Sequence, residues 1–112
     1  MVKQGSIITV DFDPQLGHEQ KGRRPALVIS NNLFNKYSAI AIVCPITSTD
    51  KNHPLHVKLN EKTKTKGVIL CDQVKTMDIK VRNFKYIETI PEDILEDVVD
   101  IVFSVISYND IV

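Results

Sequence analysis

The polar segment from Asp13 to Arg24 gathers side chains that can move protons and bind anions. His18 and Glu19 can each accept a proton and Arg24 offers a guanidinium, all within seven residues. Because Pro25 restricts the preceding residue to extended geometry, we expect Arg24 to lie where this polar loop enters a strand. Catalytic and binding groups are often carried on loops that a rigid scaffold holds in place, so the segment is the first candidate for a functional site.

Two further polar residues stand at the ends of predicted strands. If the apolar strands on either side of residues 32–38 pair antiparallel, Arg24 lies opposite Thr47. Extending the same meander through the next two turns places Thr47 opposite Pro54, and Pro54 opposite Asp72. Directly opposed side chains have Cβ atoms about 5 Å apart. We therefore predict that Arg24, Thr47 and Asp72 line one end of the sheet, beside the polar loop.

Together these groups have the chemistry that cleavage of RNA without a metal ion requires. RNA supplies its own nucleophile, the 2′-hydroxyl, so a protein must add a base for that proton, a cation for the phosphorane and an acid for the leaving 5′-oxygen. Taken one at a time, the residues have simpler structural explanations. These are a salt bridge between Arg24 and Glu19, ordinary β-propensity for Thr47, and a turn or an ion pair for Asp72.

The elements that must position these residues are mostly strands. We expect Leu33, Phe34 and Tyr37 to fold back onto the core from the connection between the strands predicted over residues 25–31 and 39–47. Runs rich in β-branched residues, bounded by turn residues, predict the strands. They cover residues 5–12, 25–31, 39–47, 55–59, 67–77 and 81–88.

One helix is predicted, at the end of the chain. Thr89 and Glu92 have the spacing of a capping box, with Pro91 in the first turn. Apolar residues then recur at helical spacing from Ile94 to Ile106. Strands followed by a helix, with little room for crossover connections, indicate a mainly β fold, namely an antiparallel barrel or strongly bent sheet with one packed helix.

Length and composition bound the remaining possibilities. With 112 residues, we expect one domain spanning residues 1–112. No apolar run approaches the ~20 residues that cross a bilayer, and the first residues lack the features of a signal peptide, so we expect a cytoplasmic protein. Cys44 and Cys71 lie in apolar runs and predict two buried, reduced thiols. Because the three histidines do not cluster with the cysteines at ligand spacing, we predict no metal site and no cofactor.

The formal net charge of zero hides an asymmetry along the chain. Residues 1–86 hold all fourteen Lys and Arg and seven of the fourteen acids, a net charge of +7. Residues 87–112 hold the other seven acids and no Lys or Arg, a net charge of −7. Such an asymmetry favours binding of the basic part to a polyanion, although acids on one solvated helix face would give the same count.

Read together, the motifs resemble those of the MazF/PemK/Kid toxins of bacterial toxin–antitoxin modules. The resemblance runs through nearly the whole chain, in order and at the spacing of that family. The segments that carry it read VDFDP at 10–14, GHEQKGRRPALV at 17–28, CPITS at 44–48, GVILCDQVKT at 67–76 and PEDIL at 91–95, followed by the helix.

The resemblance implies a fold, an activity and partners. The fold would be a small SH3-like antiparallel barrel with a C-terminal helix, assembled as a homodimer. The activity would be a sequence-specific, metal-independent endoribonuclease that cleaves single-stranded RNA, leaving a 2′,3′-cyclic phosphate and a 5′-hydroxyl. A cognate antitoxin would block the RNA groove, and operator DNA would be bound only with the antitoxin. No membrane is implied.

Residue by residue, the resemblance implies a catalytic set. Arg24 and Thr47 match the catalytic pair of the family, and Glu19 matches a loop acid proposed as the base in part of it. His18 and Asp72 match functional positions of the Kid branch. That branch has an arginine two residues before the aspartate, where this chain has Leu70, so Arg24, Thr47 and Glu19 form the core of the prediction. Candidate contacts to RNA are Gln20, Lys21, Arg23, Ser48, Lys51, Gln73, Lys75 and Lys80.

Two other functions are compatible with the same fold. A gyrase poison of the CcdB type depends on a C-terminal Trp-Gly-Ile, whereas this chain has no Trp and ends in Tyr-Asn-Asp-Ile-Val. A non-catalytic RNA-binding barrel would use the same cations without cleaving the RNA. The fate of RNA mixed with the protein in EDTA distinguishes these alternatives from a metal-independent nuclease.

Overall fold

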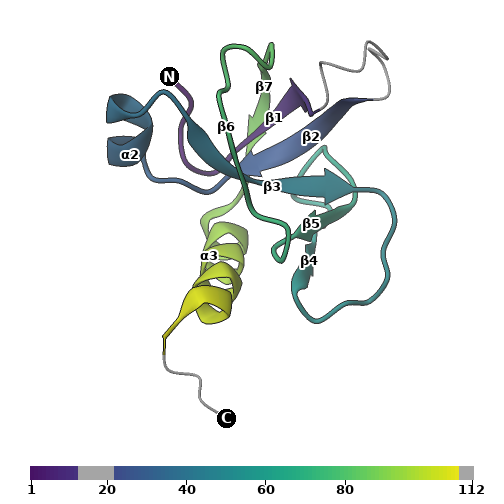
Figure 1. Ribbon diagram of the computed structural model, residues 1–112. Helices are drawn as coiled ribbons and strands as arrows, with labels where there is room; N and C mark the ends of the chain where they lie inside the picture. The colour runs from purple at the N-terminus through teal and green to yellow at the C-terminus, as the bar shows by residue number, and fades with distance from the viewer. Residues whose placement is uncertain (13–21, 109–112) are drawn as a thin grey trace.

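The computed structural model describes residues 1–12 and 22–108 and shows a bent antiparallel sheet with a C-terminal helix (Figure 1). This confirms the predicted fold class, a mainly antiparallel β structure closed by a helix. The helices are α2 (Asn32–Tyr37) and α3 (Glu92–Ile106). The strands are β1 (Ser6–Asp11), β2 (Arg23–Val28), β3 (Ala41–Thr47), β4 (His56–Lys58), β5 (Val68–Leu70), β6 (Lys75–Met77) and β7 (Lys85–Thr89).

The sheet has the order β4-β5-β3-β2-β1-β7, and β6 also pairs with β3. Strand β3 is therefore central, with β2 along one edge and both β5 and β6 along the other. β6 pairs with its first half, Ala41–Val43, and β5 with its last two residues, Ile46 and Thr47. The apolar residues of β3 are buried except for Ile42, which is half-buried, so the strand is largely covered on both faces.

Alternate residues of the central strands enter two separate cores. Ile7, Leu27 and Cys44 face a cluster that also holds Ile94 and Val98 of α3. Their neighbours along the strands form the second cluster, on the other face of the sheet, and it contains Ile8, Val10, Ala26, Val28, Ala41, Val43, Met77 and Ile79. Since side chains alternate between the faces of a strand, both sides of β1, β2 and β3 are apolar.

Helix α3 covers the first of these cores, but it does not begin with the predicted capping box. Its N-cap is Pro91, with no side-chain capping hydrogen bond. The hydroxyl of Thr89 instead pairs with that of Tyr86 at 2.8 Å. Burial of Ile94 and Val98, each worth about 1.5–3 kcal/mol, therefore holds the helix in place. No helix in the described part of the chain is long and apolar enough to cross a membrane.

Two strand predictions need correction. The strand predicted over residues 67–77 is two strands, β5 and β6, separated by a turn that begins at Cys71. The strand predicted over 81–88 is β7, which begins only at Lys85, because residues 79–82 form turns and Asn83 has a φ of 55°.

The connection after β2 also differs from expectation, because it contains the short helix α2. The side chain of its N-cap, Asn31, accepts a hydrogen bond from the Phe34 N–H at 2.8 Å. Leu33 and Tyr37 are 68% and 75% exposed rather than folded onto the core. The buried residue of this helix is Asn35, whose amide pairs with both the hydroxyl and the carbonyl of Ser30.

Candidate active site

The register of β2 and β3 brings Arg24 and Thr47 to the same end of the sheet. Ala26 pairs with Pro45 in this antiparallel ladder. Continuing the register two residues outward places Arg24 opposite Thr47, as the sequence predicted. In Figure 1 the start of β2 and the tip of β3 lie on the same side of the molecule.

A cavity of about 370 Å³ opens at this end of the sheet. It is lined by Arg23, Arg24, Pro25, Ile46, Thr47, Ser48 and Lys66. Three of these residues are cationic, two carry hydroxyl groups, and none of the described lining residues is an acid. The cavity is therefore suited to a phosphate group, to which a planar guanidinium can donate two parallel hydrogen bonds.

The Thr47 hydroxyl accepts a hydrogen bond from the backbone two residues farther along the chain. The N–H of Thr49 donates to Thr47 Oγ1 at 3.3 Å, so the hydroxyl proton remains available to donate to a bound oxygen. Farther along this connection, Asp50 pairs with Lys58 at 3.0 Å and accepts the N–H of Asn52. These contacts lower the pKa of the Asp50 carboxyl and anchor the segment that carries Ser48.

Lys66 lines the cavity but was not predicted from the sequence as a site residue. It reaches the cavity because Val68 pairs with Thr47 and Gly67 packs against the Thr47 carbonyl. The signal was the dipeptide Lys66-Gly67 immediately before an apolar strand, since glycine allows another strand to approach closely. This dipeptide indicates a position beside Thr47 only if β5, rather than β4, is the partner of β3.

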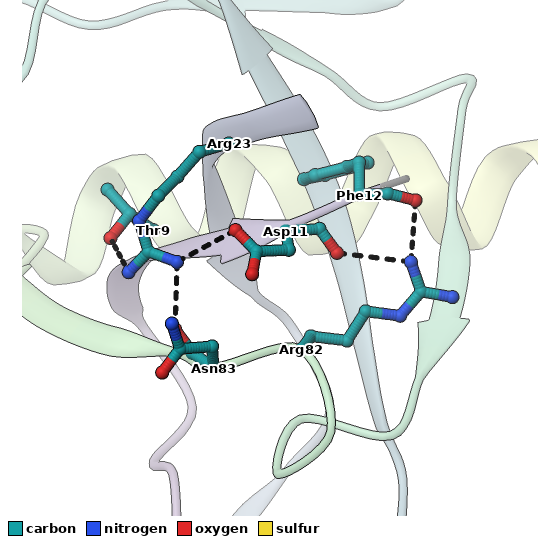
Figure 2. A network of polar contacts seen from close by, with 6 residues as sticks. All are labelled: Thr9, Asp11, Phe12, Arg23, Arg82 and Asn83. Carbon is teal, nitrogen blue, oxygen red and sulfur yellow. Dashed lines mark hydrogen bonds and ion pairs between the residues drawn. The ribbon is translucent and has the colours of Figure 1, made fainter. Parts of the chain in front are cut away.

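The guanidinium of Arg23 is held by hydrogen bonds to three described residues (Figure 2). Its guanidinium donates to Asp11 Oδ1 at 3.0 Å, Thr9 Oγ1 at 3.0 Å and the Asn83 carbonyl at 2.9 Å. Beside it, the Arg82 guanidinium donates to the carbonyls of Asp11 and Phe12. Arg23 and Arg82 thereby join the end of β1 to the turn before β7. The neighbouring Arg24 is exposed.

Asp72 does not lie at this end of the sheet, because the step of the predicted meander that put Thr47 opposite Pro54 is wrong. The predicted step from Pro54 to Asp72 agrees with the register of β4 and β5, which places these two residues opposite each other when it is continued two residues beyond His56 and Leu70. Thr47 pairs with Val68 instead, and β4 pairs only with β5. Asp72 lies four residues farther along from Val68, roughly 13 Å at the rise of a strand. Its Oδ1 contacts His56 Nε2 at 2.9 Å.

The other predicted residues are distributed as follows. Ser48 lines the cavity, Lys51 is exposed in the connection after β3, and Gln73 is exposed in the turn before β6. Lys75 pairs with Val43 and Lys80 lines a different cavity of about 380 Å³, so these two lie near the first half of β3. His18, Glu19, Gln20 and Lys21 lie outside the described residues. The described residues on either side of them are joined to each other, since the N–H of Phe12 donates to the Gly22 carbonyl at 2.7 Å.

One group of described residues has the donor types of a metal site. His53, His56 and Asp72 each offer a ligand atom, all within 4.8 Å of one another. Two of the possible ligand atoms have partners, because His53 Nδ1 accepts the N–H of Leu55 at 3.0 Å and His56 Nε2 contacts Asp72, whereas His56 Nδ1 is buried without a hydrogen-bond partner among the described residues. The two imidazole rings are also stacked, with centroids 4.4 Å apart. The interactions within the group are hydrogen bonds and ring stacking, so we describe it as a hydrogen-bonded cluster.

Comparisons with known proteins agree on one family. Residues 3–105 match the model of the PemK-like, MazF-like toxin of type II toxin-antitoxin systems. The chain is 37% identical over 101 residues to endoribonuclease PemK of Escherichia coli, covering 87% of this chain and 76% of PemK. It is 40% identical over 78 residues to endoribonuclease toxin MazF of Escherichia coli K12, covering 70% of this chain and 69% of MazF.

Solved structures agree with this result over almost the full length. MazF from Deinococcus radiodurans superposes with a TM-score of 0.84 at 34% identity, covering 96% of this chain and 97% of that one. A MazE-MazF complex from the same organism superposes with a TM-score of 0.86 at 30% identity, covering 96% and 98%.

Proposed function

Because the chain belongs to the family of PemK-like and MazF-like endoribonuclease toxins of type II toxin–antitoxin systems, we propose that it cleaves single-stranded RNA at specific sequences without a metal ion. The observation that carries the proposal is the cavity that Arg24 and Thr47 share. Its described lining is cationic and carries hydroxyl groups, as binding of an RNA phosphate requires.

The proposed reaction is attack of the 2′-oxygen on the neighbouring phosphorus. A bond forms between these two atoms, the bond from phosphorus to the 5′-oxygen breaks, and the products are a 2′,3′-cyclic phosphate and a 5′-hydroxyl. Arg24 stabilises the dianionic phosphorane, where its two parallel donors gain most. Thr47 donates a hydrogen bond to a phosphate oxygen.

The proton transfers are assigned to the loop that precedes Arg24. Glu19 is the proposed base for the 2′-hydroxyl proton, and His18 is a candidate to protonate the 5′-oxygen. Asp72 keeps its predicted role only if the RNA extends from the cavity to the His56 pair. Along that path Ser48, Lys51, Lys66 and Gln73 are candidate contacts to the backbone and bases of the RNA.

We also propose that a cognate antitoxin neutralises the protein and that operator DNA is bound only together with it. The Deinococcus MazE-MazF complex supports the first point, since that MazF has the same fold. A homodimer is proposed as well. Its support is apolar surface left uncovered at the end of α3, where Phe103 and Ile106 are 66% and 72% exposed.

We expect cleavage to persist in EDTA and to leave a cyclic phosphate. In this mechanism a guanidinium stabilises the phosphorane and protein groups transfer the protons, so chelation of metal ions should not change the rate. The measurement uses 5′-labelled single-stranded RNA with excess EDTA, and acid treatment of the product, which opens a cyclic phosphate. Loss of cleavage in EDTA would contradict the proposal. Intact but bound RNA would indicate a non-catalytic barrel, and intact RNA with supercoiling defects would indicate a gyrase poison.

Thr47→Ala should reduce the rate of cleavage more than the affinity for RNA. One hydrogen bond to a charged group is worth about 1.5–3 kcal/mol, so the single-turnover rate should fall roughly 10–100-fold. Affinity is measured with an uncleavable RNA that carries a 2′-deoxy residue at the cleavage site. Thr47→Ser is the matched control, because it keeps the hydroxyl and should retain most of the rate. Equal losses of rate and affinity in Thr47→Ala would assign the residue to binding.

A further inference from the structure

Cys44 and Cys71 are the two cysteines of the chain, and the proposed RNA chemistry uses neither. Both are free and fully buried, as predicted. Cys44 lies on β3 and Cys71 immediately follows β5. They share one core cluster with Ile46, Ile69 and residues of α3.

The register of β3 and β5 places the two cysteines opposite each other. Thr47 pairs with Val68 and Ile46 with Ile69. Extending the same register two residues beyond Ile46 and Ile69 places Cys71, at the start of the turn after β5, opposite Cys44. The distance of 27 residues between them in sequence is therefore closed by the fold.

The hydrogen bonds of β5 show which kind of pair this is. The N–H of Cys71 donates to the Leu55 carbonyl at 3.2 Å, and the Gly67 carbonyl accepts the N–H of Leu59 at 2.9 Å. The backbone polar groups of residues 67, 69 and 71 therefore point toward β4 and away from β3. Cys44 and Cys71 thus form a non-hydrogen-bonded pair, in which Cα atoms are about 4.5 Å apart and side chains are close. Disulfides span Cα separations of about 4.4–6.8 Å.

The two thiols already interact. The proximity of the Cys44 thiol lowers the pKa of Cys71, whereas the proximity of Cys71 and burial raise the pKa of Cys44; the Cys71 thiol itself donates to the Ile69 carbonyl at 3.7 Å. Cys71 is thereby the better nucleophile of the two, because the thiolate is the reactive form of cysteine.

We propose that Cys44 and Cys71 are a redox site, at which a peroxide converts the two thiols into an intrachain disulfide. The Cys71 thiolate attacks one peroxide oxygen, the O–O bond breaks, and a sulfenic acid forms with release of hydroxide or an alkoxide. The sulfur of Cys44 then attacks the sulfur of Cys71, an S–S bond forms, and water leaves with the thiol proton and the sulfenic hydroxyl. The two sulfurs lose two electrons in total, and the peroxide gains them.

This disulfide would link the centre of β3 to the turn that carries Asp72. Cys44 is three residues before Thr47, and Cys71 directly precedes Asp72. Closing a loop between residues 44 and 71 restricts the unfolded chain, so the oxidised protein should be the more stable form. Both sulfurs are inaccessible in the folded state, so oxidation requires local opening around the end of the three-residue strand β5.

Hydrogen peroxide is the oxidant for the test, applied to the folded full-length chain, free of cysteine-containing tags. After denaturation and alkylation, intact mass should show a monomer that lacks two hydrogen atoms and carries no alkyl groups. Dithiothreitol should restore two alkylatable thiols. Because the chain has two cysteines, Cys44→Ala and Cys71→Ala are matched controls, and neither should yield the species lacking two hydrogens.

The melting temperatures of the two forms give a second readout that needs no variant. The disulfide form should melt higher than the thiol form, by up to roughly 10 °C. A disulfide form that melts lower than the thiol form would overturn the proposal. So would peroxide-treated protein that keeps both thiols, accumulates sulfinic acid, or links chains to one another. Mass and melting do not depend on RNA cleavage, so the result stands apart from the proposed function.

Discussion

Arg24→Ala should lower the rate of RNA cleavage by about 10²–10³-fold without unfolding the protein. Removing one preorganised donor to a transition-state oxyanion typically costs this much. The fold should persist because Arg24 is exposed, and the three strands around it are held by the buried residues of two cores. Single-turnover cleavage of a saturating RNA substrate measures the loss, and thermal melting reports the fold.

Two further variants separate charge from geometry. Arg24→Lys keeps the positive charge but loses the planar pair of donors, so most of the loss should remain. Lys85→Ala removes one cation on β7, outside the cavity, and should leave the rate within a few-fold of the parent. If Arg24→Ala cleaves as fast as the parent chain, the guanidinium has no role in the reaction. If Arg24→Lys restores the rate, charge alone is sufficient.

The pairing of Arg24 with Thr47 could be predicted because it depends on local information. The two strands are consecutive, both are apolar over at least five residues, and the connection between them is short. The centre of that connection then sets the register, even though it contains a helical turn rather than a simple loop. A residue before proline at one strand end and a threonine at the other were enough to locate the cavity.

The position of Asp72 could not be predicted, because it depends on a choice between distant strands. β4 has only three residues and one solvent-exposed face, so the alternation of its apolar and polar residues does not show whether it pairs with β3 or lies at the edge of the sheet. In the observed order β5 lies between β3 and β4 and pairs with both of them. The same choice brought Lys66 to the cavity and Cys71 to Cys44, and neither could be inferred from spacing.

Local motifs failed where tertiary contacts supplied a better partner. The Thr89 hydroxyl bonds to Tyr86 instead of capping α3. Glu88, next to it, accepts the N–H groups of Lys64 and Thr65 and the Thr65 hydroxyl. Burial acts to raise the pKa of Glu88, but these hydrogen bonds outweigh it and lower that pKa. The contacts between β7 and the chain before β5 are thus formed by Glu88, the last residue of the strand predicted over 81–88, with Lys64 and Thr65.

Gly67→Ala should destabilise the protein by about 2–5 kcal/mol and impair cleavage as well. Gly67 has a φ of 125°, which other residues avoid, and an added Cβ would overlap the carbonyl oxygen of Thr47. The glycine cannot move aside easily, because its own carbonyl accepts the N–H of Leu59 at 2.9 Å. The melting temperature should therefore fall by roughly 10–20 °C.

Gly5→Ala is the matched control for backbone strain alone. Gly5 also has a positive φ, 89°, but a Cβ there would meet a flexible side-chain atom, Leu95 Cδ2, at 3.4 Å. We expect it to cost about 1–2 kcal/mol and to leave cleavage unchanged, measured well below both melting temperatures. Gly67→Ala must displace the backbone of Thr47, so its cleavage rate should fall even where the variant is fully folded. Equal rates in the two folded variants would show that the close approach of β5 to β3 does not position Thr47.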